Sequence, residues 1–384
     1  MKPIKIIRTS TIPASLDTFC RGQFKDLHEN EGYDIVVVSS PGKEMSEIAE
    51  REGIRTIEIP MERHISPWRD IKSLFGLIKA FRHERPTMVH SMTPKAGLLS
   101  MIAAWICRVP VRVHTFTGLV FPTATGLTKK ILIFTDRITC ACATHIIPEG
   151  EGVKNDLINF GITRKPLRVL GHGNVRGINL DWYNPELPDV KAEAAQIRKP
   201  GVFTFIFIGR LVRDKGINEL VEAFRMFTAE RDDVRLLLVG RQEPELDPLK
   251  PDTIREIESN PAIEAVGQQS DVRPWLAASD ALVFPSYREG FPNVVIEAGA
   301  MGLPSIVTDI NGSREIIIEG RNGTIIPPRD AQKLLHAMRK FVQNKERTSK
   351  MADASRKLIA SRFEQSYVRQ CLKEYYHEIL EDCH

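Results

Sequence analysis

The sequence predicts an α/β fold of two domains, each built on a parallel sheet covered by helices. Short runs of β-branched and other apolar residues alternate along the chain with segments of helical periodicity, a pattern typical of such sheets. These strand-like runs form two series, and a segment rich in Asn, Pro and charged residues lies between them. With 384 residues, the chain is long enough to build two hydrophobic cores.

The first series of strands predicts a domain over residues 1–178. Helical patterns lie between its strands, for example over residues 71–83. The predicted strands cover residues 4–8, 35–39, 56–59, 88–91, 111–116, 145–147 and 167–170.

A linker is predicted at residues 179–200, followed by a second domain over residues 201–365. The chain then ends in one helical pattern over residues 363–384. The strands predicted for the second domain cover residues 203–208, 235–239, 263–266, 281–284, 305–307 and 324–326.

The charge of the chain is unevenly distributed. The net charge of +4 is too small to indicate a nucleic-acid partner. Residues 1–178 carry 25 Lys and Arg against 17 Asp and Glu, a balance of +8, whereas the remainder carries 28 against 32, a balance of −4. This split favours different partners for the two domains, with chance scatter as the alternative.

Cysteine usage and hydropathy indicate a protein of the cytosol. The six cysteines form no CxxC pair, as expected for reduced thiols. No signal peptide is expected at the start, and the longest apolar stretch, residues 98–107, is too short to cross a bilayer.

Two cations follow the first strand of the second series. Arg210 comes directly after Gly209, and Lys215 precedes Gly216, where a helical pattern begins. Because ligands of open parallel sheets bind beyond the carboxyl ends of the strands, both cations are candidates to hold a diphosphate, Arg as a planar fork and Lys as a compact charge. The alternative is a pair of solvated loop residues.

A second set of polar residues follows the fourth strand of this series. Glu289 lies in the loop, Pro292 is placed to open a helix, and Glu297 lies about one turn inside that helix. Free backbone amides of Asn293 and Val294 would form an anion site at the helix start. Glu297 can accept hydrogen bonds from vicinal ribose hydroxyls; its alternative role is to stabilise the helix through the dipole.

The segment from Glu289 to Glu297 resembles the signature of retaining glycosyltransferase family 4. Members of that family have the GT-B fold, two Rossmann-like α/β/α domains facing each other across a cleft. The resemblance covers almost the whole chain and is most specific over residues 201–328. Further matching residues are Gly209, Arg210, Lys215, Gly216, Ser279, Asp280, Ala298, Gly299, Gly302, Leu303, Pro304, Asn311, Gly312, Ser313, Arg314 and Glu315.

The resemblance implies a role for each matched residue of the second domain. Arg210 and Lys215 would hold the diphosphate of the donor and stabilise charge on the departing nucleotide, Glu289 would contact the donor sugar, and Glu297 would hold the ribose. Arg210, Lys215 and Glu289 are therefore the catalytic candidates. The resemblance also implies retention of anomeric configuration, catalysis without metal or cofactor, and a terminal helix, residues 366–384, that packs back on the first domain. The other donor-binding candidates are Gly209, Gly290, Phe291, Asn293 and Val294.

Residues 90–97, 115–118 and 171–174 of the first half resemble those of the bacterial branch that builds polysaccharides or lipid-linked oligosaccharides, in which this domain binds the acceptor. The acceptor-side candidates are Lys95, His114, Thr117 and Gly173. Many members have His where Thr117 stands, and His114 points to the opposite face of the strand. A core role is therefore the alternative for His114, a solvated helix start for Lys95, and an ordinary turn for Gly173.

Residues 67–82 mix an apolar face with basic residues and a Trp. Such a helix can rest on an anionic membrane, although packing on a sheet gives the same pattern. Residues 119–130 are a second candidate for membrane contact.

These observations predict a cytoplasmic sugar transferase of cell-surface polysaccharide synthesis, acting at the inner face of the plasma membrane. The expected donor is a UDP-sugar carrying a hexose or N-acetylhexosamine, and the expected acceptor is a glycan or a polyprenyl diphosphate-linked sugar. The alternatives are a UDP-sugar epimerase of GT-B shape and a non-catalytic nucleotide-sugar-binding protein. A nicotinamide-dependent dehydrogenase is disfavoured, because no G-x-G-x-x-G follows a predicted strand.

Overall fold

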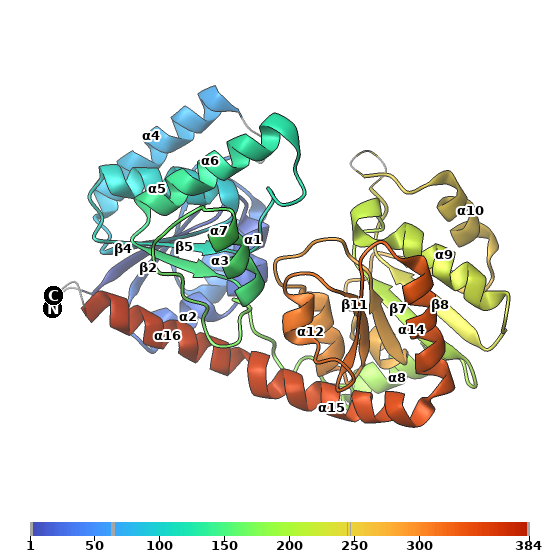
Figure 1. Cartoon of the computed structure of the whole chain (residues 1–384). Helices are drawn as coiled ribbons and strands as arrows, with labels where there is room; N and C mark the ends of the chain where they lie inside the picture. The colour runs from blue at the N-terminus through green and yellow to red at the C-terminus, as the bar shows by residue number, and fades with distance from the viewer. Residues whose placement is uncertain (1–2, 63–65, 244, 246, 382–384) are drawn as a thin grey trace. The chain divides into compact units, whose positions relative to one another are not determined.

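The computed structural model describes residues 3–62, 66–243, 245 and 247–381. The chain divides into two compact units, and Figure 1 colours it by residue number from blue at the N-terminus to red at the C-terminus. The first unit comprises Met1–Gly177 and Ser366–His384, and the second comprises Ile178–Gln365. Each unit contains one six-stranded parallel sheet.

The sheet of the first unit has the strand order β3-β2-β1-β4-β5-β6. Ile6 on the central strand pairs with Ile35 on one side and Met88 on the other. Six of the predicted strands are present, with ends shifted by at most one residue. They are β1 (Lys5–Thr9), β2 (Asp34–Ser39), β3 (Arg55–Glu58), β4 (Met88–Met92), β5 (Val111–Phe116) and β6 (His145–Pro148).

The seventh predicted strand, residues 167–170, is wrong. Only an isolated bridge forms there, between Ile146 and Leu167. Pro166 immediately before it has no N–H to donate to a ladder, and the chain turns at Gly171. The apolar residues of this segment pack beside the sheet without extending it.

Helices cover both faces of the first sheet, so successive strand residues are buried on opposite sides. Ile7, Val36 and Val89 belong to one core cluster, with helices α4 to α7. Ile6, Val37 and Met88 belong to the other cluster, with α1, α2, α3 and the C-terminal α16. The first face is covered by α4 (Pro67–Glu84), α5 (Pro94–Ile106), α6 (Gly126–Cys142) and α7 (Glu151–Asn159). The second is covered by α1 (Pro13–Cys20), α2 (Gln23–Glu29), α3 (Lys43–Glu52) and α16 (Gln365–Glu381).

The sheet of the second unit has the order β12-β11-β10-β7-β8-β9. Numbered within its own unit, this order is the same as that of the first sheet, so both units have the doubly wound arrangement of Rossmann-type folds. All six predicted strands are present here. They are β7 (Phe203–Ile208), β8 (Val234–Val239), β9 (Ile263–Gly267), β10 (Ala281–Phe284), β11 (Ser305–Thr308) and β12 (Gly323–Ile326).

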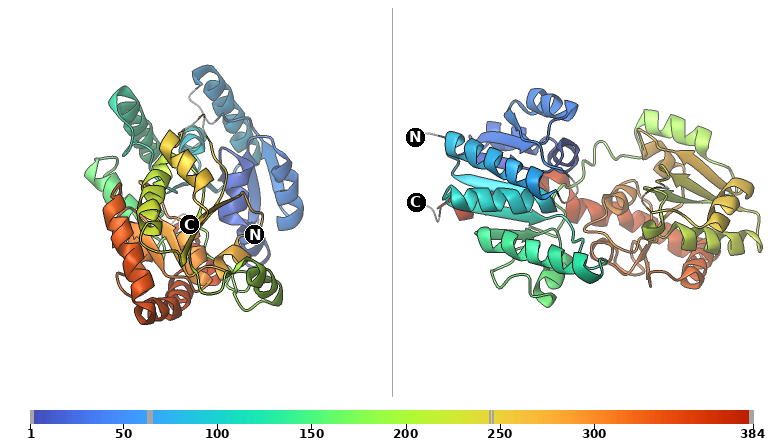
Figure 2. Two further views of the ribbon diagram at one scale, coloured as in Figure 1. Left: turned by 90° about the vertical axis from the view of Figure 1, so that its right-hand side faces the viewer. Right: turned by 90° about the horizontal axis from the view of Figure 1, so that it is seen from above.

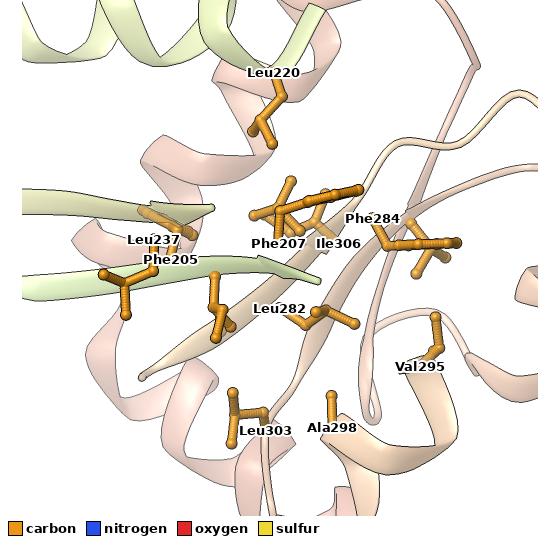
Figure 3. Packing of buried hydrophobic residues seen from close by; sticks show 14 of the residues in the cluster. Phe205, Phe207, Leu220, Leu237, Leu282, Phe284, Val295, Ala298, Leu303 and Ile306 are labelled. Atoms are coloured by element: carbon orange, nitrogen blue, oxygen red, sulfur yellow. The ribbon is translucent and has the colours of Figure 1, made fainter. Parts of the chain in front are cut away.

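One continuous core fills the second unit (Figure 3). The rings of Phe207 on β7 and Phe284 on β10 stack with centroids 5.9 Å apart, and Val295 packs near them from α12. The helices are α8 (Pro188–Ile197), α9 (Ile217–Thr228), α10 (Pro251–Ser259), α11 (Arg273–Ala277), α12 (Asn293–Ala300), α13 (Ser313–Ile316), α14 (Ala331–Gln343) and α15 (Lys345–Phe363). A short 3₁₀ turn, η1 (Arg213–Lys215), precedes α9.

The segment expected as a linker, residues 179–200, is folded into the second unit. It contains α8, which packs on α11. Val190 and Ala194, one helical turn apart, are buried, and Pro188 stands at the first position of this helix.

The single helical pattern predicted for residues 363–384 begins with the end of α15. Two helices meet there, because α15 ends at Phe363 and α16 begins at Gln365. Helix α16 packs on the first unit through Leu372, Tyr376 and Ile379. The last three residues of the predicted helix lie outside the described residues. Within the described chain, we find no helix with the length and hydropathy needed to span a bilayer.

Candidate active site

The candidate donor residues of the second unit lie where its strand order reverses. Strands β7 and β10 are neighbours at the centre of the sheet, and the chain leaves them in opposite directions to β8 and β11. Residues 209–216 follow β7 and residues 285–290 follow β10. The two loops therefore share the carboxyl edge of the sheet at its switch point, where open α/β sheets bind their ligands.

The two loops are tied together by their backbones. The Tyr287 amide donates to the Asp214 carbonyl at 2.8 Å. Gly216 adopts φ +73°, and a Cβ added there would lie 2.1 Å from the carbonyl oxygen of Pro285. Only glycine satisfies both the left-handed backbone and this close approach, so Gly216 fixes the distance between the two loops.

Lys215 and Glu289 meet across these loops. The Lys215 ammonium forms an ion pair with Glu289 Oε1, and it also lies 5.7 Å from the centre of the Phe284 ring. Both side chains are largely shielded from water, with 16% and 18% of their surface exposed. Ser286 Oγ donates a second hydrogen bond to Glu289 Oε1, at 2.8 Å. A partly desolvated ion pair held by a further hydrogen bond is a defined geometry, unlike a flexible surface pair.

Arg210 does not join this pair. Its guanidinium Nη1 donates to Glu243 Oε2 at 2.8 Å, and its side chain is half exposed. The hydrogen bond from Arg210 lowers the pKa of Glu243, which keeps that carboxylate ionised. The structure thus places Arg210 directly after β7, as expected, but with a different acidic partner from that of Lys215.

A second glycine is in close contact with the backbone of the loop before α12. Gly312 has φ +72°, and a Cβ there would lie 2.6 Å from the Gly290 carbonyl oxygen and 2.7 Å from Phe291 Cα. Phe291 is buried, with its ring 5.5 Å from that of Phe363. Gly290 and Phe291 therefore present backbone at this edge, and the Phe291 side chain belongs to the core.

Helix α12 begins at Asn293, with Pro292 as its N-cap residue. Pro292 was expected to open this helix, and it stands one position before it. Asn293 and Val294 lie in the first turn, where amides have no acceptor within the helix. Glu297 lies in the second turn, and all three side chains are partly exposed.

Three contacts in this region were missed from the sequence. Tyr287 donates to Glu219 Oε2 at 2.5 Å, and the Arg329 guanidinium lies 4.6 Å from the centre of its ring. Burial and the bond to Glu219 raise the pKa of Tyr287, so the hydroxyl is neutral. Arg288 pairs with Asp214 at 3.1 Å. The residues are far apart in the chain, and no spacing rule could have joined them.

The acceptor-side candidates are distributed along the first sheet. Thr117 follows β5 and is partly exposed, and Gly173 is buried in the turn after residue 170. Lys95, at the start of α5, forms an ion pair with Asp70 of α4 at 2.7 Å. Lys95 is thus a partly buried contact between helices, which differs from the solvated helix start considered as its alternative.

His114 lies in the core of the first unit. Its Nδ1 is 2.8 Å from Ser91 Oγ, its ring packs edge-on against Phe116, and a Cβ on Gly97 would lie 2.3 Å from its Cε1. Burial lowers the pKa of His114 to about 3, so the ring is neutral at physiological pH. This placement agrees with the core role considered for it.

No group of three or more His, Cys, Asp or Glu side chains suited to a metal ion occurs within the described part of the chain. The charged groups at the switch point of the second unit are organic cations and carboxylates, which can hold a diphosphate and a polyhydroxylated sugar directly.

Two family descriptions match the chain, one for each half. Residues 20–173 match "Glycosyl transferase 4-like domain" and residues 189–358 match "Glycosyl transferases group 1". The second match contains Arg210, Lys215, Glu289 and Glu297.

Similar proteins are found among bacterial transferases. The capsular polysaccharide biosynthesis glycosyltransferase CapM of Staphylococcus aureus is 30% identical over 387 residues, which is 100% of this chain and 99% of CapM. The UDP-Gal:α-D-GlcNAc-diphosphoundecaprenol α-1,3-galactosyltransferase of Escherichia coli is 26% identical over 326 residues, covering 83% of each protein.

Solved structures share the fold over the full length. The structure of HepE from Anabaena in complex with UDP superposes with a TM-score of 0.78 at 18% identity, covering 98% of this chain and 100% of HepE. A glycosyltransferase from Rickettsia africae gives a TM-score of 0.78 at 21% identity, with 99% of both chains covered.

Proposed function

This chain belongs to the group 1 glycosyl transferases and has the GT-B fold, and from that premise we propose that it transfers a hexose or N-acetylhexosamine from a UDP-sugar to a polyprenyl diphosphate-linked or glycan acceptor, with retention of configuration. The observation that carries this proposal is the Lys215–Glu289 pair at the switch point of the second unit. A cation and a carboxylate held side by side suit a substrate that joins an anionic diphosphate to a hydroxyl-rich sugar.

The proposal of a UDP-sugar is supported by the similar proteins. HepE was solved with UDP bound, and the E. coli relative is named for UDP-galactose. The acceptor class is supported in the same way, because the E. coli relative and a Campylobacter jejuni relative at 26% identity are both named for sugars on diphosphoundecaprenol.

In the proposed reaction, the donor diphosphate binds at the carboxyl edge of β7 and β10. Lys215 donates to its oxygens, and Arg210 turns from Glu243 to do the same. The amides of Gly209 and of the first turn of α12, at Asn293 and Val294, add donors. Glu297 accepts hydrogen bonds from the ribose hydroxyls. The backbone at Gly290 and Phe291 lines the sugar.

The chemical step breaks the bond between C1 of the sugar and the β-phosphate oxygen, and it forms a bond from C1 to the acceptor hydroxyl on the same face. The acceptor proton passes to the departing phosphate oxygen. Charge grows on that phosphate as the bond breaks, and Lys215 and Arg210 stabilise it, which is a role that other transferases give to a metal ion. Glu289 fixes the donor sugar through its hydroxyls.

On the acceptor side, Thr117 and Gly173 are proposed as contacts. Thr117 follows the carboxyl end of β5, and Gly173 lies near the end of β6, since the amide of the next residue, Asn174, donates to the Glu149 carbonyl at 2.8 Å. Lys95 would contact the acceptor only by breaking its ion pair with Asp70 and binding an acceptor phosphate instead. His114 contributes by packing. A polyprenyl-linked acceptor is held in a bilayer, so we also propose that the protein works at the cytoplasmic face of the membrane.

A panel of UDP-sugars incubated with a polyprenyl diphosphate-linked acceptor tests the function. We expect one UDP-sugar to give a product heavier by one hexosyl or N-acetylhexosaminyl group, with the anomeric configuration of the donor by NMR. Interconversion of the UDP-sugar without acceptor would instead identify an epimerase. Binding of UDP with no turnover of any donor would identify a non-catalytic protein.

A further inference from the structure

Large apolar side chains are exposed on one face of the first unit. Helices α4 and α6 both contact α5, and all three cover the same face of the sheet (Figure 1). The right-hand view of Figure 2 looks onto these helices. The exposed apolar residues on them include Trp68, Phe75, Trp105, Leu127, Ile131 and Phe134. We call these three helices, with their outward side chains, the α4–α5–α6 face.

The outward stripe of α4 cannot be explained by packing on the sheet. Trp68 and Phe75, seven residues apart, lie on one side of the helix, and they are 86% and 67% exposed. Leu77 and Phe81 on the opposite side fill the core. Packing on the sheet was the alternative to membrane contact for this helix. It accounts for Leu77 and Phe81 but not for Trp68 and Phe75.

Helix α6 repeats the same arrangement. Leu127, Ile131 and Phe134 recur at helical spacing, and Leu127 and Phe134 are 72% and 64% exposed. Trp105, near the end of α5, is 59% exposed between the two helices. An apolar area spread over three adjacent helices is more than the isolated exposed residues that soluble surfaces normally carry.

The charges on these helices have one sign at the surface. Their lysines and arginines are Arg69, Lys72, Lys79, Arg82, Lys95, Lys129, Lys130 and Arg137. Their acids are only Asp70, Glu84 and Asp136; Glu84 is buried, and the other two are partly buried.

The charge of each of these acids is compensated or reduced within the protein. Asp70 pairs with Lys95, and Glu84 pairs with Lys5 and Arg55. Burial raises the pKa of Asp136 to about 7, which reduces its charge. The cations Lys72, Lys79 and Arg82 on α4, and Lys130 on α6, are exposed. An anionic surface that also accepts apolar side chains would match both properties of the face.

We propose that the α4–α5–α6 face is a docking surface for an anionic lipid bilayer, into which Trp68, Phe75, Leu127 and Phe134 insert while the surrounding lysines and arginines contact lipid phosphates. Aromatic side chains are favoured at the interface between a membrane and water, at the level of the lipid head groups. Lysines and arginines near the membrane surface add attraction to anionic lipids. The inference rests on the proposed function, in which the acceptor is held in a bilayer, and it names the surface of the protein that contacts that bilayer. Membrane binding can be tested without measuring sugar transfer.

Cosedimentation of the full chain with vesicles tests the docking surface. The wild type should bind vesicles of phosphatidylglycerol with phosphatidylcholine, and release them at high salt. It should bind weakly to phosphatidylcholine alone. The variant Trp68→Ser/Phe75→Ser should lower the partition coefficient by about tenfold, and each cation removed in Lys72→Ala/Lys130→Ala by about fivefold.

Matched controls lie elsewhere on the first unit. Ile158→Ser removes an exposed apolar residue from α7, and Lys25→Ala/Lys43→Ala removes two exposed lysines from α2 and α3. Both controls should bind like the wild type. All the substituted residues are exposed, so melting temperatures should stay close to that of the wild type.

Three results would overturn the docking surface. They are equal binding to neutral and anionic vesicles, equal losses in the face and control variants, and a wild-type dimer that becomes monomeric in Trp68→Ser/Phe75→Ser, which would show that a second copy covers the face. Transfer to a short-chain, water-soluble acceptor should be unchanged in the face variants. If no transfer occurs at all but vesicle binding behaves as described, the proposed function fails and the docking surface stands.

Discussion

Among single side chains, Glu289 is the one whose substitution should affect sugar transfer and UDP binding differently. It faces Lys215 and accepts a hydrogen bond from Ser286. In Glu289→Gln, transfer should fall by about 10²- to 10³-fold, because a neutral amide replaces the charged carboxylate that accepts from the sugar hydroxyls. The affinity for UDP should be equal or higher, since the carboxylate that competes for Lys215 has gone. Kinetics and UDP titration of the same preparation measure both.

Lys191→Ala, an exposed cation on α8 of the same unit, is the control and should keep full activity. A Glu289→Gln enzyme with wild-type kcat would rule out Glu289 as a catalytic residue.

His114 gives a prediction for stability at low pH. Burial lowers its folded pKa to about 3, whereas the unfolded value is near 6.5. The unfolded state therefore takes up a proton as the pH falls below about 6.5, and stability is lost in that window. His114→Gln should make the dependence of unfolding free energy on pH shallower by about 1.4 kcal/mol per pH unit.

The slope is the readout for His114, because the substitution also changes stability at neutral pH. Thermal melts of both proteins between about pH 7 and pH 5 measure it. Parallel curves for the wild type and His114→Gln would contradict a neutral, buried His114.

The residues of the site were predictable only in part. Lys215 and Glu289 could be named because each follows a recognisable strand, and the strand order then brings their loops together. The partners of Arg210 and Tyr287 could not, because Glu243 and Glu219 come from other loops and helices. Side-chain pairing across a sheet edge depends on tertiary geometry, which no local pattern records.

At the scale of elements, the close contact between the loops after β7 and β10 depends on Gly216. In Gly216→Ala, the new Cβ would overlap the Pro285 carbonyl, and the loops would have to separate. We expect a loss of stability about 1–3 kcal/mol greater than in the control, together with weaker UDP binding.

Gly201→Ala is that control. Gly201 has φ +78°, close to that of Gly216, but no atom lies within 4 Å of a Cβ built there. Both variants share the backbone strain, so their difference in urea unfolding reports the loop contact. Equal losses would show that the approach to Pro285 is unimportant.

Helix α16 is held on the first unit by a buried polar contact. Arg8 Nη1 donates to the Tyr376 hydroxyl at 3.0 Å, and that hydroxyl lies 2.5 Å from His90 Nδ1. Tyr376→Phe would leave Arg8 short of a buried partner, which should destabilise the protein by about 1–3 kcal/mol.

Tyr375→Phe is the control for α16. Tyr375 is also buried, and the described part of the chain provides no hydrogen-bond partner for its hydroxyl. Hydrogen exchange should accelerate in peptides of α16 for Tyr376→Phe only. Equal exchange in both variants would contradict the anchoring contact.

Most elements could be predicted because buried parallel strands are short apolar runs bounded by polar residues. The failures have local causes. Residues 167–170 have the composition of a strand, but between Pro166 and the turn at Gly171 only a single bridge to β6 forms. Residues 179–200 have the composition of a linker, although Val190 and Ala194 at helical spacing mark the buried side of α8.

For the whole molecule, two units with separate cores should respond separately to UDP. The proposed donor site lies in the second unit, so UDP should slow hydrogen exchange in peptides covering residues 209–216 and 285–297. At a UDP concentration of about 100 Kd, the stabilisation of that unit should be about 2.7 kcal/mol. Protection centred on residues 88–95 would place the nucleotide in the first unit and contradict the proposed donor site.

The most direct test of the donor site is the affinity of the full chain for UDP, measured by titration calorimetry for the wild type and Lys215→Ala. The wild type should bind one UDP, and loss of the charge-assisted contact to the diphosphate should weaken binding by about tenfold or more. Lys191→Ala should bind like the wild type. If Lys215→Ala bound UDP as tightly as the wild type, Lys215 would not hold the diphosphate, and the donor site proposed at β7 and β10 would be wrong.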